Sequence, residues 1–325
     1  MSRIIVTEPI HADGLALLRA DPAHEVVAFD PPAGAAQMRA ALPGAAAILV
    51  RTLPLGADLL TLAPDLAIVS KHGVGCDNID LDHCSARGIP VTICAGANAN
   101  AVAEHTLALM LACARRLTAQ DAAARAGDWR FRQRTGAFEL RGRTVLVVGM
   151  GRIGRRVAPL CRAFGMRVLG HDPGAAFAEA ERADDLDAAL AQADIVTLHT
   201  PLIPETTGLI DARRLALMKP GAVLINCARG GVADEAALVQ ALTLGPLAML
   251  GTDVFVTEPV CPTDPLLSLP NVIATPHTGA MTAESTRAMA MQSARNILDC
   301  LGGRLDEDVI FNTRAPGRRT GGDTP

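Results

Sequence analysis

The sequence predicts an α/β protein that consists of two doubly wound parallel-sheet domains. Short β-branched runs alternate with longer amphipathic stretches along the 325 residues, which is the pattern of strand–helix units in parallel sheets. The runs form two series, one ending near residue 93 and the other beginning at residue 144. A chain of this length also exceeds the usual size of one hydrophobic core, so two domains are expected.

Both series can be followed run by run. The first contains five predicted strands, at residues 4–7, 25–29, 46–50, 66–70 and 90–93. The second contains six, at residues 144–148, 166–170, 194–199, 222–226, 247–251 and 271–275. The six begin about 22–28 residues apart, which leaves room for a helix and two loops between strands. The second series therefore matches a doubly wound fold of two βαβαβ halves.

Two apolar helices are expected to join the series. Residues 102–118 are rich in Leu and Ala on nearly every face, which is typical of a helix buried between packed units. We interpret this helix as the connector between the domains and as a candidate subunit contact. A second helix, over about residues 283–301, returns the chain to the first domain. The predicted domains are residues 1–98 with 287–325, and residues 99–286.

A glycine fingerprint, GMGRIG, follows the first strand of the second series and precedes an amphipathic helix. Gly149 permits a tight turn, Gly151 a close approach of the backbone to a pyrophosphate, and Gly154 close packing of helix on sheet. Phosphates would face the start of the helix, so Arg152 and Ile153 are also expected cofactor contacts. The context predicts a Rossmann domain, inserted here into a flavodoxin-like domain. A mononucleotide or FAD would satisfy the glycines alone.

An acidic residue follows the next strand of the second series. Asp172 lies 18 residues after Gly154, where a carboxylate can accept hydrogen bonds from the adenosine ribose hydroxyls. The carboxylate would repel a 2′-phosphate, and no arginine follows immediately in HDPG. NAD is therefore favoured over NADP as the cofactor.

The composition narrows the remaining classes. The formal net charge is -4 without a long run of one sign, so a small molecule is the expected partner rather than nucleic acid or a membrane. The eight cysteines show no metal-ligand spacing, which predicts no metal site and fits a reduced, cytoplasmic protein. The chain has no tyrosine, so a proton donor must be His, Asp, Glu, Lys or Cys.

Three residues of the second series follow three different strands. Arg229 lies in INCARGG, Glu258 in TDVFVTEP and His277 in TPHTG. Ligands of open parallel sheets bind beyond the carboxyl ends of the strands, so the three side chains are expected to converge on one rim. An arginine, a carboxylate and an imidazole suit hydride exchange at a carbinol that bears a carboxylate. The arginine pairs with the substrate's charge, and the imidazole exchanges the hydroxyl proton.

These motifs together resemble the D-2-hydroxyacid dehydrogenase family, from about Arg51 to the end of the sixth strand. The pieces stand in family order: AILVRT, KHGVGCDNID, NANAVAEHTLALML, the glycine fingerprint, LHTPL, MKPGAVLINCARGG, GTDVFVTEP and TPHTGA. The resemblance implies that Arg229 binds the substrate carboxylate and carbonyl oxygen. It also implies that His277 is the acid/base and that Glu258 orients it.

The resemblance implies further contacts in both domains. Asp253 would contact the nicotinamide carboxamide. The other implied cofactor contacts are Thr200, Pro201, Cys227, Ala228, Arg229, His277 and Gly279. The implied substrate contacts in the first predicted domain, residues 1–98 with 287–325, are Arg51, Val74, Gly75 and Asn98. Lys71 departs from the family pattern, because Lys71-His72 precedes Gly73 where many members carry a neutral or a single basic residue. It would add a cation at the distal end of the substrate, which suits phosphate, sulfonate or a second carboxylate.

The activity that the resemblance implies is reversible reduction of a small 2-oxo acid, such as hydroxypyruvate or glyoxylate, in an interdomain cleft of a homodimer. Two alternatives stay open. One is D-3-phosphoglycerate oxidation with Arg51 and Lys71 on the phosphate, although Leu53 stands where some phosphoglycerate dehydrogenases place a second arginine. The other is a catalytically idle NAD-sensing protein, for which no 2-oxo acid would support NADH oxidation.

Overall fold

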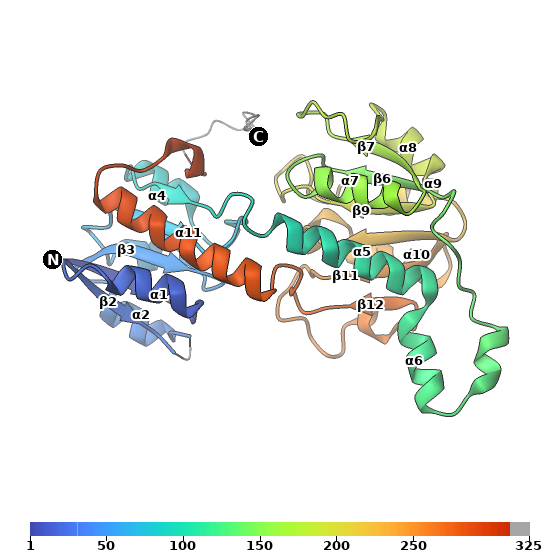
Figure 1. Ribbon diagram of the computed structural model, residues 1–325, viewed down its shortest axis with the longest axis horizontal. Coiled ribbons are helices and arrows are strands. Elements are labelled where there is room, and N and C mark those ends of the chain that lie inside the picture. The colour runs from blue at the N-terminus through green and yellow to red at the C-terminus, as the bar shows by residue number, and fades with distance from the viewer. Residues whose placement is uncertain (31, 313–325) are drawn as a thin grey trace. The chain divides into compact units, whose positions relative to one another are not determined.

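The computed structural model describes residues 1–30 and 32–312, and these form two compact units (Figure 1). The first unit combines Met1–Asn98 with the chain from Met281 onward, and the second is Ala99–Ala280. Residues 313–325, the end of the first predicted domain, lie outside the described residues. Each unit contains one sheet, and every strand pairing in the two sheets is parallel.

The sheet of the first unit has five strands in the order β2-β1-β3-β4-β5. The strands are β1 (Ser2–Val6), β2 (His24–Ala28), β3 (Ala45–Val50), β4 (Ile68–Lys71) and β5 (Val91–Thr92). This order is that of flavodoxin-like folds, in which the order reverses beside β1. Successive residues of β1 face opposite sides, since Ile4 and Val6 belong to one buried cluster and Ile5 to the other. Both faces of the sheet are therefore buried.

Helices cover the two faces of this sheet. On one face lie α1 (Ala12–Arg19) and α11 (Ala283–Leu301), and on the other α2 (Ala35–Ala41), α3 (Ala57–Leu60) and α4 (Leu81–Ala86). The helix predicted over 283–301 is thus present. A Cβ atom on Gly14 would lie 2.7 Å from the carbonyl carbon of Ala290, so α1 and α11 pack closely only with glycine there. The last element of the described part is the turn η4 (Glu307–Val309). After it, the Phe311 N–H donates to the Val91 carbonyl of β5.

The sheet of the second unit has seven strands in the order β12-β11-β10-β9-β6-β7-β8. The strands are β6 (Thr144–Val148), β7 (Arg167–His171), β8 (Glu181–Arg182), β9 (Ile195–Leu198), β10 (Ala222–Asn226), β11 (Leu247–Thr252) and β12 (Val272–Ala274). The order reverses between β6 and β9, which is the Rossmann arrangement with one further strand. The predicted fold class is confirmed. The sequence prediction missed β8, because its two exposed, charged residues form no apolar run.

Helices again cover both faces. The long helix α5 (Ala99–Arg115) packs with α7 (Gly154–Ala163) on one face, as Figure 1 shows. On the other face lie α8 (Leu186–Gln192), α9 (Ala212–Leu217) and α10 (Glu235–Thr243). The short turns η2 (Gly230–Val232) and η3 (Pro265–Ser268) follow β10 and β11. Within the described residues, no helix has both the length and the apolarity needed to cross a membrane.

The helix predicted over residues 102–118 begins earlier, at Ala99, and is interrupted before its predicted end. It ends at Arg115, Arg116 takes a left-handed backbone with φ of 53°, and α6 (Leu117–Arg125) begins after it. The prediction did not see this break because Arg-Leu-Thr carries no Gly or Pro. The apolar faces of α5 are buried in the core of its own unit. By contrast, α6 and the following turn η1 (Trp129–Gln133) bury no residue.

Candidate active site

The glycine loop between β6 and α7 has the shape that a dinucleotide needs. Gly149 has φ of 95°, and a Cβ there would lie 2.7 Å from the carbonyl group of His199. A Cβ on Gly154 would lie 2.1 Å from the Gly149 carbonyl oxygen. A Cβ on Gly151, in contrast, would meet nothing within 4 Å, so this position opens onto free space. The first turn of α7 also has N–H groups without helical acceptors, which is the arrangement that binds phosphate oxygens at helix N-termini.

Asp172 closes the same loop from the end of β7. Its carboxylate is buried and accepts hydrogen bonds from the N–H groups of Met150 and Gly174, each over 2.9 Å. The side chain therefore fixes the glycine loop, and it places a carboxylate where the adenosine ribose was expected. Arg182 also lies here, because its Nη2 donates to the Asp172 carbonyl oxygen over 3.3 Å. The sequence had shown no arginine directly after Asp172, and the pairing of β7 with β8 brings one to this position.

The loop after β9 carries two buried polar atoms without a hydrogen-bond partner among the described residues, His199 Nδ1 and Thr200 Oγ1. The other ring nitrogen of His199 lies 2.9 Å from Thr197 Oγ1. Burial lowers the pKa of His199 to about 3, so its imidazole is neutral. Buried polar atoms are normally paired, and these two belong to residues that directly contact the Gly149 position of the glycine loop. Thr200 and the next residue, Pro201, were expected cofactor contacts.

The turn after β10 presents Arg229. Asn226, the last residue of the strand, accepts from the Ala228 N–H through Oδ1 and donates to the Arg229 carbonyl through Nδ2, both over 3.0 Å. A Cβ on Gly230 would lie 2.0 Å from the Phe255 carbonyl carbon. Only glycine therefore lets this turn lie against the loop that follows β11. The half-buried Arg229 is brought next to the loop that carries Glu258.

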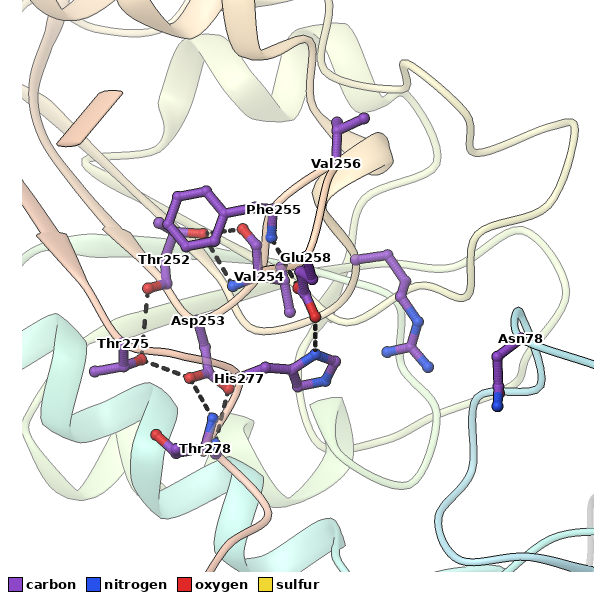
Figure 2. A network of polar contacts seen from close by, with 12 residues as sticks. Asn78, Thr252, Asp253, Val254, Phe255, Val256, Glu258, Thr275, His277 and Thr278 are labelled. Atoms are coloured by element: carbon purple, nitrogen blue, oxygen red, sulfur yellow. Dashed lines mark hydrogen bonds and ion pairs between the residues drawn. The ribbon is translucent and has the colours of Figure 1, made fainter. Parts of the chain in front are cut away.

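Glu258 and His277 form a hydrogen-bonded pair at the end of the sheet (Figure 2). His277 Nδ1 lies 2.6 Å from Glu258 Oε2, and Glu258 Oε1 accepts from the Phe255 N–H over 3.0 Å. Burial alone would raise the pKa of Glu258, but these hydrogen bonds and the charges of His277 and Arg229 lower it. The carboxylate is therefore ionised at neutral pH. Since Nδ1 faces Glu258 and the His277 side chain is 47% exposed, Nε2 is left for a ligand.

Asp253 holds the loop on which His277 stands. Its buried carboxylate accepts from Thr275 Oγ1 (2.5 Å) and from the N–H groups of Thr278 and Gly279 (both 2.8 Å). Its main-chain carbonyl accepts from the His277 N–H over 2.9 Å. Burial alone would raise the pKa of Asp253, but the hydrogen bonds lower it. The side chain that was expected at the nicotinamide thus organises the 275–279 loop, as Figure 2 shows.

His105 completes this network from α5. Its Nε2 lies 3.0 Å from Thr275 Oγ1 and 3.5 Å from Asp253 Oδ1. No sequence pattern singles out His105 among the eight histidines, since it is distant in sequence from the strand ends. The missing signal was the packing of α5 against β11 and β12, which a single sequence does not contain.

Comparison with known proteins identifies the family. Residues 107–279 match the family described as D-isomer specific 2-hydroxyacid dehydrogenase, NAD binding domain. D-3-phosphoglycerate dehydrogenase of Mycobacterium bovis is 43% identical over 279 residues, which are 84% of this chain and 52% of that protein. Glyoxylate reductase of Aeropyrum pernix is 37% identical over 97% of this chain and 98% of its own. The chain belongs to the D-isomer specific 2-hydroxyacid dehydrogenase family.

A similar solved structure supports the assignment. D-lactate dehydrogenase from Aquifex aeolicus, crystallised with NAD and lactic acid, is 30% identical with a TM-score of 0.84, covering 93% of this chain and 96% of its own. The resemblance seen in the sequence is thereby confirmed, and the second unit is the NAD-binding domain of the dehydrogenase family. The chain spans about half the length of the D-3-phosphoglycerate dehydrogenases that it matches.

The substrate contacts expected in the first unit lie at or beyond the ends of β3 and β4, apart from Asn98, which directly precedes α5. Arg51 follows β3, Lys71 ends β4, and Val74 and Gly75 lie in the loop after it. Lys71 is buried, and its Nζ donates to the Arg51 carbonyl oxygen and to Asn78 Oδ1. The structure thus brings Arg51 and Lys71 together. A buried acid not selected from the sequence, Glu8, lies beside them.

Proposed function

We propose that the protein is an NAD-dependent D-2-hydroxyacid dehydrogenase acting on a small 2-oxo acid such as glyoxylate or hydroxypyruvate. The observation that carries the proposal is the His277–Glu258 hydrogen bond beside Arg229, on the sheet that carries the glycine loop. A proton donor, its carboxylate partner and a cation for a carboxylate are the groups that this reduction needs. The extent of the match to glyoxylate reductase supports the same substrate class.

Bound NADH would supply the hydride that reduces C2 of the acid. Arg229 holds the substrate carboxylate and polarises the carbonyl oxygen. His277 Nε2 would give its proton to the carbonyl oxygen, on which negative charge develops as C2 is reduced, and the imidazole would be left neutral. Before the proton is transferred, the Glu258 carboxylate stabilises the protonated imidazole. Its hydrogen bond with Nδ1 leaves Nε2 to face the substrate. In the oxidative direction neutral His277 accepts the hydroxyl proton.

The first unit would supply the remaining substrate contacts. We propose this role for Arg51, the Val74–Gly75 backbone and Asn98, all of which match the family motifs. The remaining glycine-loop and strand-end residues, from Gly149 to Gly279, would hold NAD. This division makes the discontinuous unit the substrate-binding domain and Ala99–Ala280 the cofactor domain.

A panel of 2-oxo acids tests the function directly. Initial rates of NADH oxidation are measured with glyoxylate, hydroxypyruvate, pyruvate and 3-phosphohydroxypyruvate, and each is repeated with NADPH. We expect the highest kcat/KM with NADH and one of the two small acids. If none of the four acids supports NADH oxidation, the result contradicts the proposal and favours the NAD-sensing alternative.

D-3-phosphoglycerate dehydrogenase activity is the second candidate, and the 43% identity to the mycobacterial enzyme favours it. Arg51 would then contact the phosphate. The same panel separates the two candidates, because this activity requires 3-phosphohydroxypyruvate to exceed hydroxypyruvate in kcat/KM. Parity or preference for the unphosphorylated acid supports the main proposal.

We further propose that the protein is a cytoplasmic homodimer formed through α6 and η1. Trp129 is 74% exposed and Leu117 58% exposed on this segment, which buries no residue in its own chain. Such apolar exposure is typical of an interaction surface. All eight cysteines are free, which fits a reducing compartment. Sedimentation of wild type and Trp129→Ser tests the dimer, which the substitution should weaken.

A further inference from the structure

The loop that follows β3 is held by charged side chains from both neighbouring strands. β1 pairs with β3 so that Val6 lies opposite Leu49, and the same register places Glu8 level with Arg51. On the other side Val50 lies opposite Lys71 of β4. Glu8 and Lys71 are 5% and 8% exposed. A buried carboxylate and a buried ammonium therefore flank the loop that carries Arg51.

The Glu8 carboxylate is surrounded by donors from this loop. The N–H of Arg51 donates over 2.7 Å, that of Thr52 over 2.8 and 2.9 Å to the two oxygens, and that of Leu53 over 3.2 Å. The Thr52 hydroxyl donates over 2.5 Å. Three successive N–H groups around one anion form a nest. Burial alone would raise the pKa of Glu8, but these donors lower it, so the carboxylate is ionised at neutral pH.

Lys71 holds the opposite side of the same turn. Its Nζ donates to the Arg51 carbonyl oxygen and, over 2.5 Å, to Asn78 Oδ1. Asn78 in turn donates through Nδ2 to the Leu53 carbonyl over 2.7 Å. The N–H of Arg51 thus meets an anion while its carbonyl meets a cation, which matches the polarity of both groups.

The segment that carries Glu8 also touches the arginine head. Arg51 Nη1 donates to the Pro9 carbonyl oxygen over 2.7 Å. A proline disfavours the helical conformation of the residue before it, so Pro9 limits the backbone freedom of Glu8. The two residues Glu8 and Pro9 therefore hold both the backbone and the guanidinium of Arg51.

We propose that Glu8 and Lys71 are positioning residues that fix the Arg51–Leu53 turn and thereby set where the Arg51 guanidinium meets the 2-oxo acid. The inference rests on the proposed function, in which Arg51 binds substrate. It gives Lys71 a role that differs from the substrate contact expected from the sequence. The ammonium acts through Arg51, and the first unit's cation for a carboxylate is the arginine.

Steady-state kinetics of the full chain test this inference with Glu8→Gln, Arg51→Gln and the double variant, using NADH with glyoxylate and hydroxypyruvate. Glu25→Gln is the matched control, because Glu25 is an exposed glutamate on β2 of the same sheet. NADH affinity and Tm are measured for every variant. Thr52→Val removes one donor to Glu8 and replaces Glu8→Gln in the comparison if that variant does not fold.

We expect Glu8→Gln to raise KM for the 2-oxo acid about 10-fold or more, with a much smaller change in kcat and unchanged NADH affinity. The double variant should have the same KM as Arg51→Gln, because both substitutions act on the same contact between Arg51 and the substrate. A folded Glu8→Gln enzyme with the control's KM, or effects that multiply in the double variant, overturns the inference. Wild type that reduces neither acid is a different result, which overturns the proposed function itself.

Discussion

His277 Nδ1 lies 2.6 Å from Glu258 Oε2 although His277 has a left-handed backbone, with φ of 54°. Arg116 is the only other residue without glycine's freedom that has a positive φ in the described part of the chain. A left-handed conformation costs a residue with a Cβ about 1–2 kcal/mol. The main-chain hydrogen bond to Asp253 and the side-chain hydrogen bond to Glu258 offset that cost. The imidazole is thus held in one orientation from both its backbone and its ring.

Replacement of the imidazole tests its role as acid/base. His277→Asn should lower kcat for 2-oxo acid reduction by about 100- to 10,000-fold, because an asparagine amide cannot exchange a proton near neutral pH as an imidazole does. NADH affinity, measured by fluorescence titration, should stay close to wild type. Asparagine also tolerates a left-handed backbone, so the loop should persist. Wild-type turnover in this variant would show that another group donates the proton.

The carboxylate partner of the imidazole has a test of its own. Glu258→Gln keeps a side chain of the same size but removes the negative charge that faces His277 Nδ1. The rate of reduction at neutral pH should fall about 10- to 100-fold, because the proton donor loses the group that orients it and stabilises its charge. Initial rates and NADH affinity of the variant and wild type measure this effect. Wild-type turnover in Glu258→Gln would mean that Glu258 does not act on the proton donor.

Asp253 predicts a pH-dependent contribution to stability. Its pKa is lowered in the folded protein, so its contribution is fully present above the ordinary pKa of about 4 and is lost as the pH falls through the lower folded value. Asp253→Asn should lower the free energy of unfolding by about 1–3 kcal/mol at pH 7, since the hydrogen bonds to a buried anion are weakened. Urea titrations at pH 7 and at a series of pH values below about 4 measure the difference, which should shrink as the pH falls through the folded pKa of Asp253. A difference that does not depend on pH would contradict an ionised Asp253.

Arg182 gives a test of cofactor choice. It lies beside Asp172, and replacing that aspartate removes the charge that should repel a 2′-phosphate. Asp172→Ser should therefore lower the ratio of kcat/KM for NADH to that for NADPH by about 10-fold or more. In an Arg182→Gln background the gain for NADPH should be smaller. Since Asp172 also holds the Met150 N–H, both variants should lose some NADH affinity. An unchanged ratio would assign Asp172 to loop structure alone.

How far the sequence predicted this molecule depends on whether a feature is local. The glycine loop, α11 and the strands of both series were visible because apolar runs and glycines mark them directly. The positions of Arg229, Glu258 and His277 followed from the rule that parallel strands end at one edge. The contacts of His105 with Thr275, and of Glu8 with Thr52, depend on strand register and helix packing over long separations. No spacing in the chain reports such contacts.

Alanine substitutions at Gly151 and Gly154 of the glycine fingerprint should have different effects. At Gly154 a Cβ would lie 2.1 Å from the Gly149 carbonyl oxygen, so Gly154→Ala should lower the free energy of unfolding by about 1–3 kcal/mol or prevent folding. At Gly151 a Cβ meets no protein atom within 4 Å, so Gly151→Ala should keep the wild-type Tm. The added methyl group would instead occupy the space expected for the pyrophosphate, and NADH affinity should fall about 10-fold or more. Thermal unfolding and NADH titration of both variants measure the contrast. A Gly151→Ala protein with wild-type NADH affinity would mean that the dinucleotide does not approach the backbone there.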